Sequence, residues 1–152
     1  MRVEVDQSGK IGDTKVPTVL AFSNGKRYSV LIPATVKREC IQWLRSKGEV
    51  KLETRVYIKL FSVGVYLLLR KQIKTLEQVI IDIEYPGHEV KIKEHLLNLF
   101  QRTNIRIHPS KLQFNLVGKK SNAHDIAIKT FRGIIKPNQV ITLDEILKEF
   151  RK

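Results

Sequence analysis

The seven residues "VIIDIEY" at 79–85 constrain the fold more than any other stretch of this chain. Apolar side chains occupy both faces of this predicted strand, and both faces must therefore be covered, as in a central strand of an α/β protein. The two acids, Asp82 and Glu84, are two residues apart and project from the same face. Carboxylates at such a position cost free energy unless they reach the exposed end of the strand, pair with a lysine or bind a cation.

The remaining pattern predicts one mixed α/β domain over residues 1–152, with a meander of three strands at its start. The turn-forming pair Asn24 and Gly25 joins the second and third of these strands, and Thr142 with Glu145 predicts a capping box at the last helix. Strands or extended segments are predicted at 1–7, 18–22, 28–32, 79–85, 105–107 and 112–117. Helices are predicted at 34–47, 55–74, 91–102, 121–132 and 142–151.

Charge is the strongest compositional signal, with 28 lysine and arginine residues against 15 aspartate and glutamate residues and a net charge of +13. Such an excess indicates a polyanionic partner, of which nucleic acid is the commonest. The single cysteine, Cys40, excludes an internal disulfide and a cysteine-rich zinc site. The longest apolar run, residues 60–69, is too short to cross a bilayer, and no secretory leader is visible. We therefore expect a cytoplasmic protein that has no membrane partner.

Two further carboxylates stand at positions where functional groups are often presented. Asp6 in "VEVDQSG" comes near the end of the first predicted strand and before a glycine-bearing turn. Asp125 in "SNAHDIAIKTFRG" lies in the first turn of a predicted helix, where an acid also stabilises the helix dipole by ~0.3–1 kcal/mol. The basic residues around Asp125 favour a helix end that can hold a metal and a phosphate together. These candidate nucleic-acid-binding residues are Lys119, Lys120, His124, Lys129 and Arg132.

The order of these acids resembles the ribonuclease H-like superfamily, which includes ribonucleases H, RuvC-type junction resolvases and transposase cores. That layout has one acid at the end of the first strand of a meander, one at the end of a later central strand and one near the start of a late helix. Asp6, then Asp82 or Glu84, then Asp125 carry it here, and "DQSG" resembles the Asp-x-x-Gly opening of several members. The resemblance covers about residues 1–132 and implies a mixed five-stranded sheet with helices on both faces.

The resemblance also implies a function, which is metal-dependent hydrolysis of phosphodiester bonds in DNA or RNA. Two Mg²⁺ or Mn²⁺ ions would sit between the carboxylates, one activating a water and the other stabilising the leaving oxygen. Asp6 would bridge both ions, Asp82 or Glu84 would hold one, and Asp125 would hold the other, so that all four are candidate catalytic and metal residues. Candidate phosphate contacts are Lys10, Lys119 and Lys120, and a homodimer would suit cleavage of a junction.

Three other interpretations are open at this point. Members of the superfamily often carry a fourth acid that no position here clearly supplies, which suits a catalytically inactive nucleic-acid-binding module of the same fold. Alternatively, Asp82 followed by Glu89 and Lys91 across a hairpin at Pro86 and Gly87 resembles the restriction-endonuclease-like nucleases. There the acids hold Mg²⁺ and the lysine orients the water. A basic structural protein with no nucleic-acid role is the third.

Overall fold

The computed structural model describes residues 1–23, 25–48 and 53–150, and these residues form a mixed six-stranded sheet with five α-helices. The strand order is β5-β4-β1-β2-β3-β6. The first three strands form an antiparallel meander, β4 is parallel to β1, β5 is parallel to β4, and β6 is parallel to β3. The strands are β1 (Arg2–Ser8), β2 (Thr18–Ser23), β3 (Arg27–Ile32), β4 (Gln78–Asp82), β5 (Leu112–Asn115) and β6 (Gln139–Val140).

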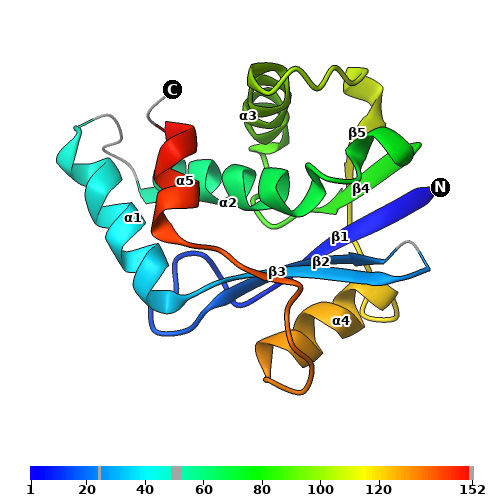
Figure 1. Cartoon of the computed structure of the whole chain (residues 1–152), viewed down its shortest axis with the longest axis horizontal. Helices are drawn as coiled ribbons and strands as arrows, with labels where there is room; N and C mark the ends of the chain where they lie inside the picture. The colour runs from blue at the N-terminus through cyan, green and yellow to red at the C-terminus, as the bar shows by residue number, and fades with distance from the viewer. Residues whose placement is uncertain (24, 49–52, 151–152) are drawn as a thin grey trace.

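The helices cover both faces of the sheet unequally (Figure 1). One helix, α4, lies alone on one face against β1, β2 and β3, while the other four pack together on the opposite face around the long central α2. The helices are α1 (Ala34–Ser46), α2 (Glu53–Leu69), α3 (Glu89–Arg102), α4 (Asn122–Phe131) and α5 (Leu143–Phe150). No helix in the described part of the chain has both the length and the apolar character that crossing a membrane requires.

The main core lies between the sheet and α2, and a glycine allows this helix to approach closely. A Cβ added at Gly64 would lie 2.7 Å from Cδ1 of Leu20 on β2, which is closer than real side chains come. Val3 and Val5 of β1 point into this core. Because side chains alternate along a strand, Asp6 points to the other face, toward α4. The thinner second core beneath α4 uses small residues, Ala21 and Ala127, where the helix meets the sheet.

The mixed α/β class is confirmed, and the sheet has one strand more than the five expected. The added strand, β6, has only two residues, which are too few to show the alternation of apolar and polar side chains that marks a strand in the sequence. Residues 105–107 form no strand, and the second helix ends at Leu69, before a short 3₁₀ turn at Ile73–Thr75. In the predicted hairpin turn, Gly25 has a φ of +94°, whereas Asn24 lies outside the described residues, as does position 151 of the last predicted helix.

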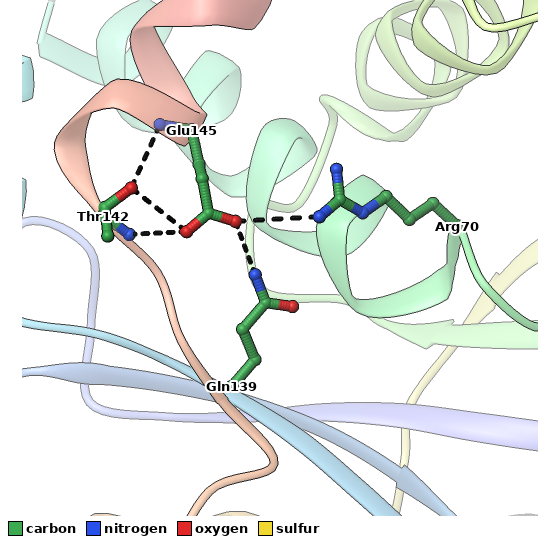
Figure 2. Close-up of polar contacts among 4 residues, drawn as sticks. All are labelled: Arg70, Gln139, Thr142 and Glu145. Atoms are coloured by element: carbon green, nitrogen blue, oxygen red, sulfur yellow. Dashed lines mark hydrogen bonds and ion pairs between the residues drawn. The ribbon is translucent and has the colours of Figure 1, made fainter.

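The predicted capping box at the start of α5 is confirmed (Figure 2). Oγ1 of Thr142 accepts from the backbone amide of Glu145 at 3.2 Å, and Oε1 of Glu145 accepts from the amide of Thr142 at 3.1 Å. The second carboxylate oxygen of Glu145 accepts from Nε2 of Gln139 and pairs with Arg70 at 3.6 Å. One side chain therefore joins the start of α5 to β6 and to the residue that follows α2.

Candidate functional site

Two adjacent parallel strands bring the first two candidate acids together. Val5 of β1 pairs with Ile81 of β4, so that Asp6 and Asp82 follow at neighbouring positions on the same face. Glu84 comes two residues after Asp82, beyond the end of β4. Carboxylate oxygens of all three residues lie within 4.8 Å of one another, which makes them a group able to hold a metal ion.

Hydrogen bonds fix two of these carboxylates. Asp6 is only 4% exposed; its Oδ1 accepts from the amide of Gln7 at 2.8 Å, and its Oδ2 lies 2.8 Å from Nδ1 of His124 on α4. Oδ1 of Asp82 accepts from the amide of Val117 at 2.7 Å, and a side-chain hydrogen bond joins Asp82 to Glu84, so its described partners do not include a lysine. The carboxylates are therefore held in place by groups from α4 and from the loop before it.

Electrostatically the cluster is short of positive charge. Burial, followed by the nearness of Asp82 and then of Asp6, raises the pKa of Glu84 to about 8, with Lys10 opposing the shift. Burial is also the main influence that raises the pKa of Asp6, against hydrogen bonds from Gln7 and His124 that lower it. Three carboxylates so close together favour uptake of either protons or a cation, since both relieve their repulsion.

The structure does not bring Asp125 to this cluster. Its side chain is 57% exposed and pairs with Lys129 at 3.0 Å, one helical turn on. Ser121 caps the helix by accepting from the amide of Ala123, so Asp125 lies in the first turn, where its charge stabilises the dipole. The side chain that reaches the cluster from α4 is His124, which the sequence analysis placed among the phosphate-binding residues.

The helical phase of α4 explains this difference and was available in the sequence. The buried positions Ala123, Ile126 and Ala127 define the face that meets the sheet. At about 100° per residue, position 125 points away from that face, whereas position 124 lies at its border. The apolar pattern therefore selects His124 over Asp125 as the residue that can approach β1.

Of the predicted lysine contacts, Lys10 acts on the cluster through its charge, which opposes the shift at Glu84, and both residues line one cavity. Lys119 and Lys120 are exposed on the loop between β5 and α4, whose residue Val117 binds Asp82. The remaining two lie on the outer side of α4: Lys129 is paired with Asp125, and Arg132 is exposed at the C-terminal end of the helix.

A buried lysine that sequence reasoning missed holds the loop carrying Lys10. Lys37 of α1 is fully buried, and its ammonium donates to the carbonyl oxygens of Lys10 and Asp13 at 3.0 and 2.7 Å and to Oγ1 of Thr18 at 3.1 Å. Burial lowers the pKa of Lys37 to about 8, with the charge of Asp13 opposing the shift. The loop between β1 and β2 is therefore fastened from inside the protein, beside the carboxylate cluster.

The restriction-endonuclease-like interpretation does not hold. It requires residues 89–92 to form a strand after a hairpin, but Glu89–Arg102 is helix α3. Lys91 points outward and pairs with Glu94 at 3.3 Å. This segment forms a helix because Ile92 and Leu96, at helical spacing, are both buried on one side of α3.

Comparison with known proteins adds nothing to this geometry: no protein-family model, curated protein or solved structure matches the chain. The chemistry must therefore be inferred from the side chains themselves. They form a group of three carboxylates, one buried and two half-buried, with an imidazole beside it, in a protein of net charge +13. Such a group suits a hard divalent cation, and the basic surroundings suit an anionic ligand.

Proposed function

We propose that this protein is a metal-dependent nuclease of the ribonuclease H-like superfamily, acting on phosphodiester bonds in DNA or RNA. The convergence of Asp6, Asp82 and Glu84 at neighbouring strands carries the proposal, because these are three of the four expected metal residues. The antiparallel meander with Asp6 in its first strand, and the acid that ends the adjacent parallel β4, support the superfamily assignment. The net charge of +13 supports a polyanionic substrate.

The residues present fit Mg²⁺ or Mn²⁺ as the cofactor. All three donors are carboxylates, which hard divalent cations prefer, and the raised pKa of Glu84 marks a site that lacks counter-charge. Asp6, Asp82 and Glu84 would hold the metal. When bound, the metal supplies Lewis-acid activation of water and stabilisation of the leaving oxygen. That two ions bind, as the superfamily resemblance implies, stays a prediction, as does the homodimer.

The chain's own residues would contribute position and charge. His124 holds Oδ2 of Asp6 and so fixes the orientation of that carboxylate. We therefore assign His124, in place of Asp125, as the residue that α4 contributes to the site. Lys10, fixed by the contacts of Lys37 with its loop, offers an ammonium group for a phosphate beside Glu84. Lys119 and Lys120 extend this positive surface along the loop that binds Asp82.

A second candidate is a nucleic-acid-binding module that has lost catalysis. The position of Asp125 favours it, because the expected fourth metal residue faces solvent and pairs with Lys129. Such a module would bind nucleic acid with steep salt dependence and would need no metal.

Cleavage of a labelled panel of substrates distinguishes the two candidates. Single strand, duplex, RNA–DNA hybrid and four-way junction would be incubated with Mg²⁺ or Mn²⁺ and the wild type, Asp6→Asn or Asp125→Asn. We expect metal-dependent cleavage that Asp6→Asn lowers by more than about 100-fold. Asp125→Asn is the matched control, since the same change outside the cluster should leave the rate within about twofold. Salt-sensitive binding without cleavage by any of the three proteins would instead establish the binding module.

A further inference from the structure

A cavity of about 240 Å³ lies next to the carboxylate cluster. Its walls come from β1, from the loop between β1 and β2, from α2 and from the residues that follow β4. The lining residues are Gln7, Lys10, Gly12, Asp13, Tyr57, Glu84 and Tyr85. Glu84 belongs both to this lining and to the cluster, so the two sites share a wall.

The walls of the cavity suit a flat aromatic ligand. Tyr57 lies against Gly12, where an added Cβ would come within 3.0 Å of the ring atom Cε2. Tyr85 packs against Phe61 in an edge-on arrangement, with ring centroids 5.3 Å apart and 65° between the ring planes. Two tyrosines therefore line one small space, and aromatic rings are the side chains on which nucleobases stack.

Polar groups in the same cavity suit the edge of a base and a phosphate. Gln7 lines the cavity, and an amide side chain can offer both a donor and an acceptor to a base. Lys10 contributes positive charge at the boundary with Glu84.

We infer that this cavity receives one unstacked nucleobase, belonging to the nucleotide next to the phosphate at the carboxylate cluster. The inference rests on the proposed function, because the cluster is what fixes the position of the phosphate. The volume lies below the roughly 300–1,000 Å³ of pockets for drug-sized ligands, which suits a single base.

The substrate class follows from the energy of unstacking. Extruding a base from an intact duplex breaks pairing as well as stacking, and one new stacking contact does not offset both. A base that is already unpaired loses only stacking, which Tyr57 and Tyr85 can replace. The preferred substrates are therefore single strands, bulges and junctions, and an intact duplex is a poor substrate.

The test uses a single strand in which one adenine at a time is replaced by the fluorescent base 2-aminopurine. Binding to the wild type, in Ca²⁺ to follow binding apart from cleavage, should change the fluorescence strongly at one position and weakly at the others. Tyr57→Leu should abolish that position-specific change and weaken binding by about tenfold. Tyr28→Leu is the matched control, because Tyr28 is the second residue of β3 and lies outside the cavity.

Gly12→Ala provides a second variant that removes no core atoms. Its new methyl group would come within 3.0 Å of the Tyr57 ring and push it by a few tenths of an ångström, so we expect a smaller fluorescence change with unaltered thermal stability. In the cleavage assay, the wild type should prefer a bulged duplex over an intact one by at least about tenfold, and Gly12→Ala should reduce the preference.

The outcomes separate this inference from the proposed function. Metal-dependent cleavage with no preference for unpaired substrates, or binding with no position-specific fluorescence change, would overturn the base cavity and leave the nuclease intact. Neither cleavage nor binding of any strand would overturn both. A fluorescence change that persists in Tyr57→Leu and is undiminished in Gly12→Ala would place the base elsewhere and reject the cavity.

Discussion

Glu84→Gln is expected to change the way in which the stability of this protein depends on pH. In the folded protein, burial and the neighbouring acids raise the pKa of Glu84 from 4.5 to about 8. The folded state therefore binds this proton more tightly than the unfolded state does. The stability that results is fully present below pH 4.5 and is lost as the pH rises through about 8. Glutamine stays neutral throughout and escapes this loss.

The size of the effect follows from the two pKa values. Their difference corresponds to about 5 kcal/mol if the whole shift is expressed in stability. Glu84 is partly exposed, and solvent screens some of the repulsion, so we expect about half of that value. Between about pH 5 and about pH 9, the wild type should lose ~2–3 kcal/mol of unfolding free energy relative to Glu84→Gln, or about 5–10 °C in Tm.

Urea denaturation across this pH range, in the presence of a chelator, measures the difference directly. Glu94→Gln is the matched control, because Glu94 is an exposed acid on α3 paired only with Lys91 among the described residues. This control should follow the wild type within about 0.5 kcal/mol. Adding Mn²⁺ at high pH should restore stability to the wild type, because a bound cation stabilises ionised carboxylates, and should do so less in Glu84→Gln.

Parallel pH dependences for the wild type and Glu84→Gln would refute the argument that ionisation of Glu84 destabilises the folded protein. An equal response of both proteins to Mn²⁺ would show that Glu84 holds no metal, whatever the pH dependence.

Three further predictions concern the groups around the cluster. His124→Ala should lower the cleavage rate by about 10–100-fold and raise the Mn²⁺ concentration needed for half-maximal cleavage, because Asp6 loses its positioning hydrogen bond. His124→Gln, which can still donate to Asp6, should recover part of the rate. Lys37→Met should lose about 1–3 kcal/mol in urea denaturation near pH 7, because three oxygens that are buried or half-buried lose their donor. The wild type should gain stability from about pH 8 to 10.5 and the variant should not, so that the same gain in the variant would contradict the assignment. Replacing Lys119 and Lys120 together by alanine should reduce the slope of log binding constant against log salt by about 1–2, and an unchanged slope would remove them from the phosphate contacts.

Local patterns predicted most of the elements of this fold because each pattern has a local cause. Alternation marked β1, the doubly apolar "VIIDIEY" marked β4 as a covered strand, and Thr142 with Glu145 marked the start of α5. The pairing of β1 with β4 was a long-range consequence that no single window contains. β6 was missed because two residues carry no period.

The candidate site was predicted in part for a similar reason. Asp6 lies in β1 and Asp82 ends β4, and their meeting required only that the two strands be neighbours in this register. The choice between His124 and Asp125 depended on the rotation of α4 about its axis. The short motif "HDIAIK" does not define this rotation, whereas the pattern of buried positions along the whole helix does. Lys37 was missed because a lysine on a helix is normally solvated, and only the folded loop supplies its three acceptors.

The short strand β6 has a consequence for how the molecule meets other copies of itself. Without it, the outer edge of β3 would present free N–H and C=O groups over an apolar strand, which is a template for pairing with another chain. Gln139 and Val140 occupy that edge, and the carboxylate of Glu145 keeps them there by bonding Gln139 and pairing with Arg70 (Figure 2). Residues 139–145 thus cover the outer edge of β3 against pairing with another copy, so that loosening this short segment should reduce solubility.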